Sequence, residues 1–286
     1  MDLGRVGVWW SGPWRAAADP ALNVAAELEA LGYGALWSSG GFDAGLSPIF
    51  GQLLSSTTKI AVASGIVSMW TATPADIGPA VADLAERFPG RFLLGIGASH
   101  AALVSDYTHP YSHMVAYLDA LDSLKDPVRA EHRVLAALGP RMLELSAQRA
   151  AGAHPYFVPA AHTAHARSVL GPGPLLAPEV AVVLETDPTA ARSLAREYAS
   201  LYLGLPNYAQ NLLRFGFDDG DIGGGGSDRL IDSVIPWGDA AALADRIGEH
   251  YDAGADHVCV QVISAAGRDG FPLVEYTELA GEFIAG

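Results

Sequence analysis

The sequence predicts an α/β fold, a (β/α)8 TIM barrel that forms a single domain over residues 1–286. Eight short apolar runs recur along the chain, and amphipathic, alanine-rich segments separate them. The length of 286 residues also suits a barrel with one large core. An open doubly wound sheet is the alternative. However, the first run is not followed by the G-x-G-x-x-G turn that binds dinucleotides in such sheets.

The eight apolar runs are the predicted strands. Each is rich in β-branched, aromatic or other apolar residues and is bounded by glycine, proline or polar positions. In chain order they are residues 5–10, 34–39, 59–67, 91–97, 133–138, 154–158, 179–186 and 257–264.

The segments between these runs predict helices, for example over residues 20–32, 74–90 and 239–254, which begin at Pro or Asp and end near Gly. Two longer stretches predict insertions, residues 99–113 after strand four and residues 201–238 before strand eight. The second contains "DDGDIGGGGSD", which lacks the glycine and glutamate positions of a calcium loop and predicts a mobile, solvated loop.

Composition excludes several partners. The formal net charge is −15, and the 17 basic residues, of which 2 are Lys, are scattered, so we expect neither nucleic acid nor an anionic membrane as a partner. The start "MDLGRVGVWW" has no secretory signal and no apolar run is long enough to span a membrane, which predicts a cytoplasmic protein. The single cysteine, Cys259, lies in a strand-like run and is interpreted as core.

In a barrel, the active site lies at the carboxyl ends of the strands. Those ends supply aromatic and small residues with few charges, a lining that suits a flat heteroaromatic cofactor. Gly65 lies late in strand three, where a glycine marks a bulge or a close backbone approach. After strand five, Gly139 and Pro140 begin a helix, and its first amides offer an anion site for a cofactor phosphate.

Four segments together resemble a known family: "LGYGALW", "KIAVASGIV", "PADIGPAVADLAERFPGRFLLGIGASH" and "WGDAAALADRIGEHYDAGADHVCVQV". They resemble the bacterial luciferase-like monooxygenase superfamily of flavin and deazaflavin oxidoreductases, and are most similar to its actinobacterial branch that depends on coenzyme F420. The resemblance covers nearly the whole chain. It implies a barrel that carries F420, or alternatively FMN, at the strand ends, a small-molecule substrate and a homodimer.

The resemblance also implies site residues. A bulge in strand three, often with a non-proline cis peptide behind the cofactor ring, matches Ser64, Gly65 and Ile66. The other implied cofactor contacts follow strands two, four and five: Ser39, Gly97, Ala98, Ser99, Ala136, Ala137, Leu138, Gly139 and Pro140. Three tryptophans and one histidine are the expected substrate contacts: Trp9, Trp10, Trp70 and His113.

His100 is the expected catalytic residue, because the family often presents an acid or base at its position. The pKa of a free histidine, near 6.5, lets it give or accept a proton at neutral pH. Many F420-dependent relatives carry Asp-His after strand two, where this chain has Ser39-Gly40. We expect no metal, because Pro110 places His109 outside the helix that carries His113.

The leading hypothesis is an oxidoreductase that transfers a hydride between F420 and a small, largely apolar organic substrate. The alternatives are an FMN-dependent monooxygenase and a cofactor-binding protein without turnover. An unrelated sugar-phosphate barrel is a third, weaker alternative, because only Arg268 offers a charged donor near strands seven and eight.

Overall fold

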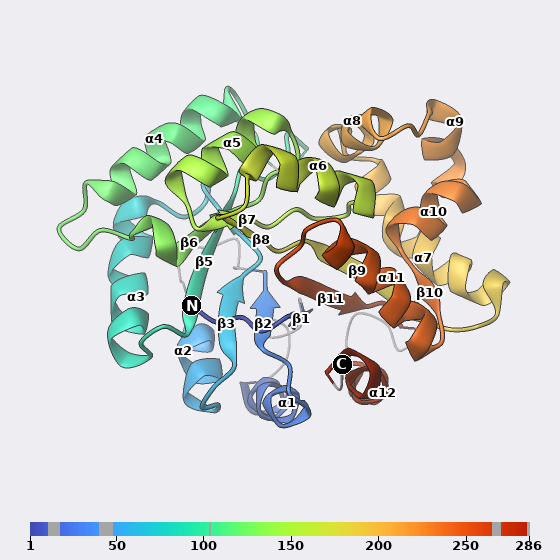
Figure 1. The fold of residues 1–286 in the computed structure, drawn as a ribbon. Helices are drawn as coiled ribbons and strands as arrows, with labels where there is room; N and C mark the ends of the chain where they lie inside the picture. Colours follow the sequence, from blue (N-terminus) through green and yellow to red (C-terminus); the bar gives the residue numbers. More distant parts are fainter. Residues whose placement is uncertain (11–17, 40–47, 103, 265–269, 285–286) are drawn as a thin grey trace.

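The computed structural model describes residues 1–10, 18–39, 48–102, 104–264 and 270–284. In them, parallel strands alternate with helices around a barrel (Figure 1). The strands are β1 (Val6–Trp9), β2 (Ala35–Ser38), β3 (Ala61–Ser64), β4 (Val67–Ser68), β5 (Phe92–Gly97), β6 (Arg133–Leu135), β7 (Gly152–Ala153), β8 (Leu175–Leu176), β9 (Glu179–Leu184), β10 (Trp237–Gly238) and β11 (Val258–Val262). The helices are α1 (Ala18–Leu31), α2 (Pro48–Ser55), α3 (Pro74–Arg87), α4 (Pro110–Asp122), α5 (Pro140–Arg149), α6 (Ala160–Leu170), α7 (Pro188–Leu203), α8 (Pro206–Arg214), α9 (Asp219–Ile222), α10 (Asp228–Val234), α11 (Ala240–Asp252) and α12 (Leu273–Phe283).

The barrel closes through one interrupted strand. The sheet order is β10-β9-β11-β1-β2-β3-β5-β6-β7-β8, and β8 and β9 are two parts of one run that Ala177 and Pro178 separate. The N–H of Ala177 donates to the carbonyl of Ala153 (3.0 Å), and the N–H of Cys259 donates to the carbonyl of Pro178 (2.9 Å). This run therefore joins β7 to β11, and the α/β barrel that the sequence predicts is confirmed.

Three strand boundaries differ from the prediction. Strand three divides into β3 and β4 at Gly65, whose peptide bond to Ile66 is cis. The predicted strand over residues 154–158 is wrong, because β7 covers Gly152–Ala153. Pro155 has no N–H to donate and Phe157 has a φ of 55°, so the regular ladder ends before them. The short strand β10, which the sequence analysis missed, pairs with the end of β9.

The inward faces of the strands form a small hydrophobic core. It contains Leu3, Trp9, Ala35, Trp37, Ala61, Ala63, Leu93, Val134, Ala177 and Cys259. The alanines leave room for the fully buried indole of Trp37, which stacks on His154 at 4.3 Å. The Nε1–H of Trp37 donates to Nε2 of His257 (3.1 Å), so this interior polar group is satisfied.

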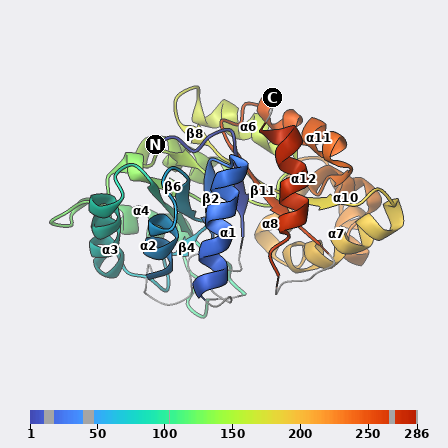
Figure 2. The same cartoon turned by 90° about the horizontal axis from the view of Figure 1, so that it is seen from below.

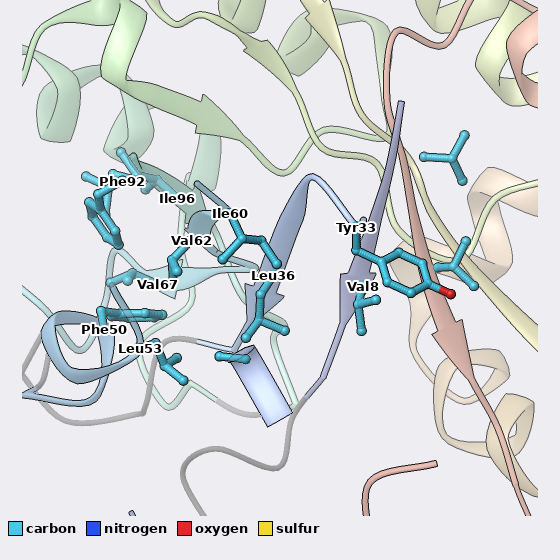
Figure 3. Packing of buried hydrophobic residues seen from close by; sticks show 14 of the residues in the cluster. Val8, Tyr33, Leu36, Phe50, Leu53, Ile60, Val62, Val67, Phe92 and Ile96 are labelled. Carbon is cyan, nitrogen blue, oxygen red and sulfur yellow. The ribbon is translucent and has the colours of Figure 1, made fainter. Parts of the chain in front are cut away.

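The outward faces pack against the surrounding helices. Figure 3 shows Leu36 of β2, Val62 of β3 and Phe92 of β5 beside Phe50 and Leu53 of α2. The rings of Phe50 and Phe92 lie 5.4 Å apart. Seen from below, α1 and α12 lie side by side on the same outer side of the barrel (Figure 2). No helix of the described ranges is both long and apolar enough to cross a membrane.

The segment before the last strand is a folded cap and not the mobile loop that we expected. Residues 218–228 contain α9, whose Asp218 and Asp221 form a reciprocal capping box, and the 3-10 helix Gly223–Gly225. Arg229 holds Asp221 in an ion pair. Acidic side chains that we expected to be solvated are therefore bound within the protein.

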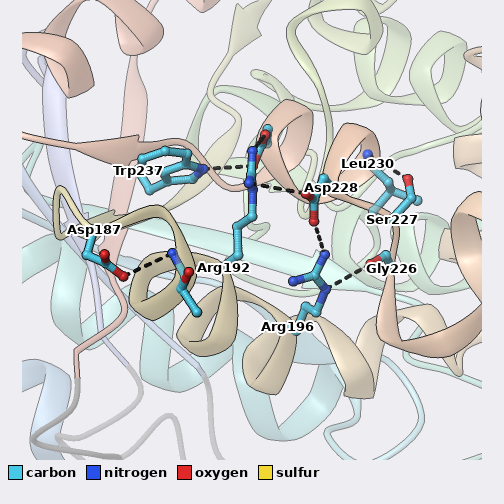
Figure 4. Close-up of polar contacts among 10 residues, drawn as sticks. Asp187, Arg192, Arg196, Gly226, Ser227, Asp228, Leu230 and Trp237 are labelled. Atoms are coloured by element: carbon cyan, nitrogen blue, oxygen red, sulfur yellow. Dashed lines mark hydrogen bonds and ion pairs between the residues drawn. The ribbon is translucent and has the colours of Figure 1, made fainter.

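Arginines of α7 attach that helix to α10. Arg192 donates to both carboxylate oxygens of Asp232 (2.9 and 2.5 Å), and Arg196 pairs with Asp228 and donates to the carbonyl of Gly226 (Figure 4). Trp237 of β10 donates its Nε1–H to the same Asp232 (2.7 Å). The helices α7 to α10 therefore stand together on one side of the barrel (Figure 1).

Candidate active site

The carboxyl end of strand three carries the bulge that the resemblance implied. The hydroxyl of Ser64 donates to the carbonyl of Gly95 (3.0 Å) and accepts its N–H (2.8 Å), which fixes β3 to β5. A Cβ on Gly95 would lie 2.0 Å from the carbonyl oxygen of Ser64, and a Cβ on Gly97 would lie 2.5 Å from Cδ1 of Ile66. These two glycines therefore allow the bulge to pack, and the cofactor contact expected of Gly97 stays a prediction.

Gly65 lies over two polar aromatic side chains of the barrel interior. A Cβ there would lie 2.5 Å from Nε1 of Trp9 and 3.3 Å from Nε2 of His154. His154 holds its Nδ1 2.7 Å from the carbonyl of Ala177, so Nδ1 carries the proton and Nε2 has a free lone pair. Burial lowers the pKa of His154 to about 4, so the ring is neutral. Because both side chains lie directly beneath Gly65, Trp9 and His154 form part of the floor below the bulge.

His100 lies at the mouth after β5. It follows Ser99, which has a φ of 56°, and its Nδ1 lies 3.0 Å from Oδ1 of Asn207 at the start of α8. Because the amide oxygen only accepts, Nδ1 carries the proton and Nε2 is left as the basic nitrogen. The ring of Tyr208 lies 5.3 Å from that of His100. Burial lowers the pKa of His100, although the hydrogen bond to Asn207 opposes this, so the imidazole is neutral at neutral pH.

Two of the expected substrate contacts lie together. The rings of Trp70 and His113 stack at 4.2 Å, and Nε1 of Trp70 donates to the carbonyl of Ala98 (2.6 Å). Tyr107 lies on the same indole, with its ring centre 5.5 Å away. Trp10 lies apart from this group and packs on Phe271 at 4.9 Å. The aromatic wall therefore has one part near α4 and another near α12.

The expected anion site has the helix start that the sequence predicted. Gly139 is the N-cap of α5 and Pro140 occupies the first turn. Arg214, at the end of α8, adds a guanidinium group whose Nη1 lies 3.4 Å from the position of a Cβ on Gly139. Nε2 of His162 lies 2.9 Å from the carbonyl oxygen of Leu138, and this hydrogen bond fixes the turn that precedes α5. A cation at a helix N-terminus strengthens an anion site, because the charge and the free amides act together.

The remaining expected cofactor contacts separate into two groups. Ala98 and Ser99 are half-buried at the mouth, and Ser39 is half-buried at the end of β2, while Gly40 lies outside the described residues. Ala136 continues the sheet, since its N–H donates to the carbonyl of Ile96 (2.9 Å). The side chain of Ala137 is buried among Leu143, Ala166 and other residues of α5 and α6, so only its backbone faces the site.

Sequence reasoning missed a buried polar cluster beside the mouth. The fully buried Glu179 begins β9, and the hydroxyls of Tyr156, Tyr198 and Tyr202 and the amide of Gln261 lie around it. Two signals were available: an acid that opens the apolar run "EVAVVL", and tyrosines four residues apart in α7. Arg214 and Asn207 were missed as well. Within the described ranges, no three His, Cys, Asp or Glu side chains are grouped to hold a metal ion.

The family described as "Luciferase-like monooxygenase" matches residues 5–257. The chain belongs to the luciferase-like monooxygenase family. It is therefore an oxidoreductase of the luciferase-like type, as the resemblance implied. No curated protein matches the chain significantly in sequence. The match shows the family, and membership of the F420-dependent branch stays a prediction.

Three solved structures illustrate the likeness in fold. A coenzyme F420-dependent tetrahydromethanopterin reductase from Methanopyrus kandleri is 17% identical with a TM-score of 0.76, covering 99% of each chain. An F420-dependent secondary alcohol dehydrogenase in complex with an F420-acetone adduct is 14% identical with a TM-score of 0.72, covering 98% of each chain. A type II Baeyer-Villiger monooxygenase from Pseudomonas putida in complex with FMN is 15% identical with a TM-score of 0.62, covering 97% of this chain and 98% of that one. At these identities the likeness shows that this luciferase-like chain shares their fold.

Proposed function

We propose that this luciferase-like oxidoreductase binds coenzyme F420 across the barrel mouth and transfers a hydride between it and a small, largely apolar organic substrate. One observation carries the proposal. The mouth combines a bare backbone floor at Gly65 with an anion site at the start of α5, where Arg214 approaches Gly139. A flat ring with a phosphate-bearing tail matches this pair of features.

The residues present fit such a cofactor. Ser64, Gly65 and Ile66 would support one face of the ring, and Gly97, Ala98 and Ser99 would line its edge. The first amides of α5, with Arg214, would hold the phosphate through charge-assisted hydrogen bonds. The aromatic walls at Trp10, Trp70 and His113 would enclose the substrate, and their few charges favour an apolar molecule.

The bound deazaflavin supplies the hydride chemistry, and the protein supplies position and proton transfer. His100 is neutral because burial lowers its pKa, so it serves as a proton acceptor at neutral pH. Asn207 keeps the Nδ1–H of His100 in place, which presents the lone pair of Nε2. Positions 39 and 40 carry Ser and Gly and not histidine, so His100 is the imidazole to which we assign proton transfer.

The test is a titration of the purified protein with F420, FMN and riboflavin, followed by tryptophan fluorescence. We expect F420 to bind most tightly, and Gly65→Val to abolish binding because its side chain would meet Trp9 and His154. His100→Ala should largely keep binding. Gly173→Val is the matched control, since a Cβ on Gly173 meets no atom within 4 Å.

A second variant isolates the phosphate site. Arg214→Gln should weaken F420 and FMN binding about tenfold or more, because a charge-assisted hydrogen bond contributes about 1.5–3 kcal/mol. It should leave riboflavin, which has no phosphate, unaffected. Preference for FMN over F420 would indicate an FMN-dependent monooxygenase instead. Binding of none of the three would overturn the cofactor assignment.

A further inference from the structure

The polar cluster beside the mouth is a continuous chain of hydrogen bonds. The hydroxyl of Tyr156 lies 2.7 Å from that of Tyr198 and 3.0 Å from that of Tyr202, and it donates to Oε1 of Gln261 (2.9 Å). The hydroxyl of Tyr198 lies 3.0 Å from the same Oε1 and 3.4 Å from Oε1 of Glu179. These residues come from the turn after β7, from α7, from β9 and from β11.

Glu179 holds a proton at the inner end of this chain. Its side chain is fully buried, and burial raises its pKa to about 8, although the N–H of Phe157 and the hydroxyl of Tyr198 oppose the shift. A neutral carboxyl has one O–H to donate, and the oxygen of Tyr198 is the side-chain acceptor within reach. Tyr198 can then donate to Tyr156, and Tyr156 donates to Oε1 of Gln261, so the hydroxyl protons point away from Glu179.

The groups that face Glu179 do not compensate a negative charge. Tyr156 and Phe157 face it from the turn after β7, Tyr198 from α7, Tyr208 from α8 and Cys259 from β11. Burial raises the pKa of the tyrosine hydroxyls and of the Cys259 thiol, so all of them are neutral. An ionised Glu179 would therefore be an unpaired buried charge, which is strongly unfavourable.

Tyr156 is the member of the chain that packs on the floor beside Gly65. Its ring is half-buried and lies 5.5 Å from that of Trp9, whose Nε1 lies 2.5 Å from the position of a Cβ on Gly65. Its ring also lies 6.4 Å from that of Tyr208, which in turn lies 5.3 Å from His100. The hydroxyl chain and His100 therefore approach the floor for the ring from two different elements.

We propose that Tyr156 is a further catalytic residue, which gives a proton to the substrate oxygen and is resupplied through Tyr198 by Glu179. This inference rests on the proposed function. In carbonyl reduction the substrate carbon receives a hydride, with its two electrons, from reduced F420, and the C=O π bond becomes a C–H bond and an O–H bond. The O–H proton comes from Tyr156, whose hydroxyl gives up its hydrogen bond to Oε1 of Gln261. Tyr156 then takes the proton of Tyr198, and Tyr198 takes that of Glu179.

The remaining protons balance through His100. Reduced F420, when bound, would supply one ring proton besides the hydride, and the neutral Nε2 of His100 would accept it. The step thus leaves Glu179 as a carboxylate and His100 as an imidazolium, and solvent at the open mouth restores both after the product leaves. Alcohol oxidation runs the same transfers in reverse.

The first test uses infrared spectroscopy without a substrate. The difference spectrum between wild type and Glu179→Gln should show the carbonyl stretch of a protonated carboxylic acid at pH 7, which disappears with a midpoint near pH 8. Glutamine suits this comparison because it is uncharged, is close in shape to the neutral acid and can also donate a hydrogen bond. The band should move in Tyr198→Phe and in Tyr156→Phe. It should stay in place in Tyr117→Phe, a buried tyrosine that donates to the carbonyl of Ala72 (2.8 Å) outside the cluster.

The second test adds oxidised F420. Binding should shift the band of wild type, because the ring lies next to Tyr156, and the shift should vanish in Tyr198→Phe while the Kd for F420 is retained. The relay would be overturned if the carboxylic band is absent, or if its frequency is the same in wild type, Tyr198→Phe and Tyr156→Phe. If F420 binds and the band does not respond, the relay is overturned and the proposed function stands. If F420 does not bind, the proposed function fails instead.

Turnover then separates a catalytic from a structural role. Reduced F420 is mixed with acetone, cyclohexanone or benzaldehyde, and its reoxidation is followed by absorbance with the best acceptor. Tyr156→Phe should lower kcat about 100-fold or more with little change in KM, as expected for loss of a general acid. Glu179→Gln should remove the fall in kcat above about pH 8 that wild type shows. Unchanged kcat in Tyr156→Phe would overturn the catalytic role.

Discussion

His100 and Glu179 show how burial sets protonation at the level of single residues. Burial lowers the pKa of His100 and raises that of Glu179, since in both cases it disfavours the charged form. Both groups are consequently neutral near pH 7. One is left with a lone pair and the other with a proton, so they form the acid–base pair that the proposed hydride transfer requires.

The protonated state of Glu179 predicts how stability depends on pH. Its pKa is about 8 in the folded protein and about 4.5 without burial, so its stabilising contribution is complete below pH 4.5 and is lost as the pH rises to 8. Between these values, the unfolding free energy of wild type relative to Glu179→Gln should fall by about 1.4 kcal/mol per pH unit, and above pH 8 the difference should be constant. Urea denaturation from pH 5 to 9 measures this. The exposed Glu144→Gln is the control, and parallel profiles for wild type and Glu179→Gln would refute the assignment.

The contact between His100 and Asn207 predicts how the pKa of His100 responds to a negative charge beside its ring. Asn207→Asp places a carboxylate 3 Å from Nδ1 of His100, and an adjacent negative charge favours the imidazolium. We expect the pKa of His100 to rise by about 1 to 2 units, measured by NMR titration of the ring protons. Asn23→Asp, on the exposed face of α1, should leave it unchanged. A pKa for His100 that does not respond would show that the two side chains do not meet in solution.

At the level of elements, α7 connects the stability of the fold to the site. Ala191, Ala195 and Ala199 recur every four residues and are fully buried in one cluster with Ala181 and Val183 of β9. Their small size lets the helix approach the strand closely, and Tyr198 and Tyr202 then reach Tyr156. The arginines of α7 fix the helix from its other side through α10.

Arg192 is the residue that tests this attachment. Arg192→Ala removes a bidentate pair with Asp232 and a further ion pair with Asp228, so we expect a larger loss in the free energy of unfolding than removal of a single exposed pair causes. The control is Arg87→Ala, which removes an exposed pair with Asp83 within α3 and should cost no more than about 0.5 kcal/mol. Both are measured by urea denaturation. Equal losses would show that the bidentate pair contributes no more than an ordinary surface pair.

At the level of the whole molecule, the barrel has an excess of negative charge. The net charge is −15, and the excess carboxylates repel one another more strongly in the compact state than in the unfolded chain. Pairs such as Arg167 with Asp256 neutralise some of the acids locally. The excess remains, because the chain has 32 acidic and 17 basic residues.

Salt should therefore stabilise this protein. Raising NaCl from 0.05 to 0.5 M shortens the screening length from about 14 to about 4 Å, which weakens the repulsion. We expect Tm to rise by about 2 °C or more at pH 7.5, since about 1 kcal/mol shifts the Tm of a domain of this size by a few degrees. The same series at pH 5, nearer the pI of about 4.8, is the control and should show a smaller rise. A Tm that falls with salt at pH 7.5 would show that attractive pairs outweigh the net repulsion.

The sequence by itself determined the features that depend on local pattern. Alternation of apolar runs with amphipathic segments predicted the barrel, and Gly139 with Pro140 predicted the start of α5 correctly. The glycine in "VASGIV" predicted the bulge that separates β3 from β4. These features depend on residues a few positions apart, whose spacing is visible in the chain.

Only the tertiary structure decided the chemical surroundings of the site. His100 meets Asn207 across 107 residues, and Tyr156 meets Gln261 across 105. Such contacts depend on how α7 and α8 pack over the strand ends, and no local period encodes them. Whether Glu179 is ionised depends likewise on which groups exclude water from it. For that reason the sequence could propose His100 as a candidate for proton transfer but offered no local pattern that would assign a role to Glu179, Tyr156 or Arg214.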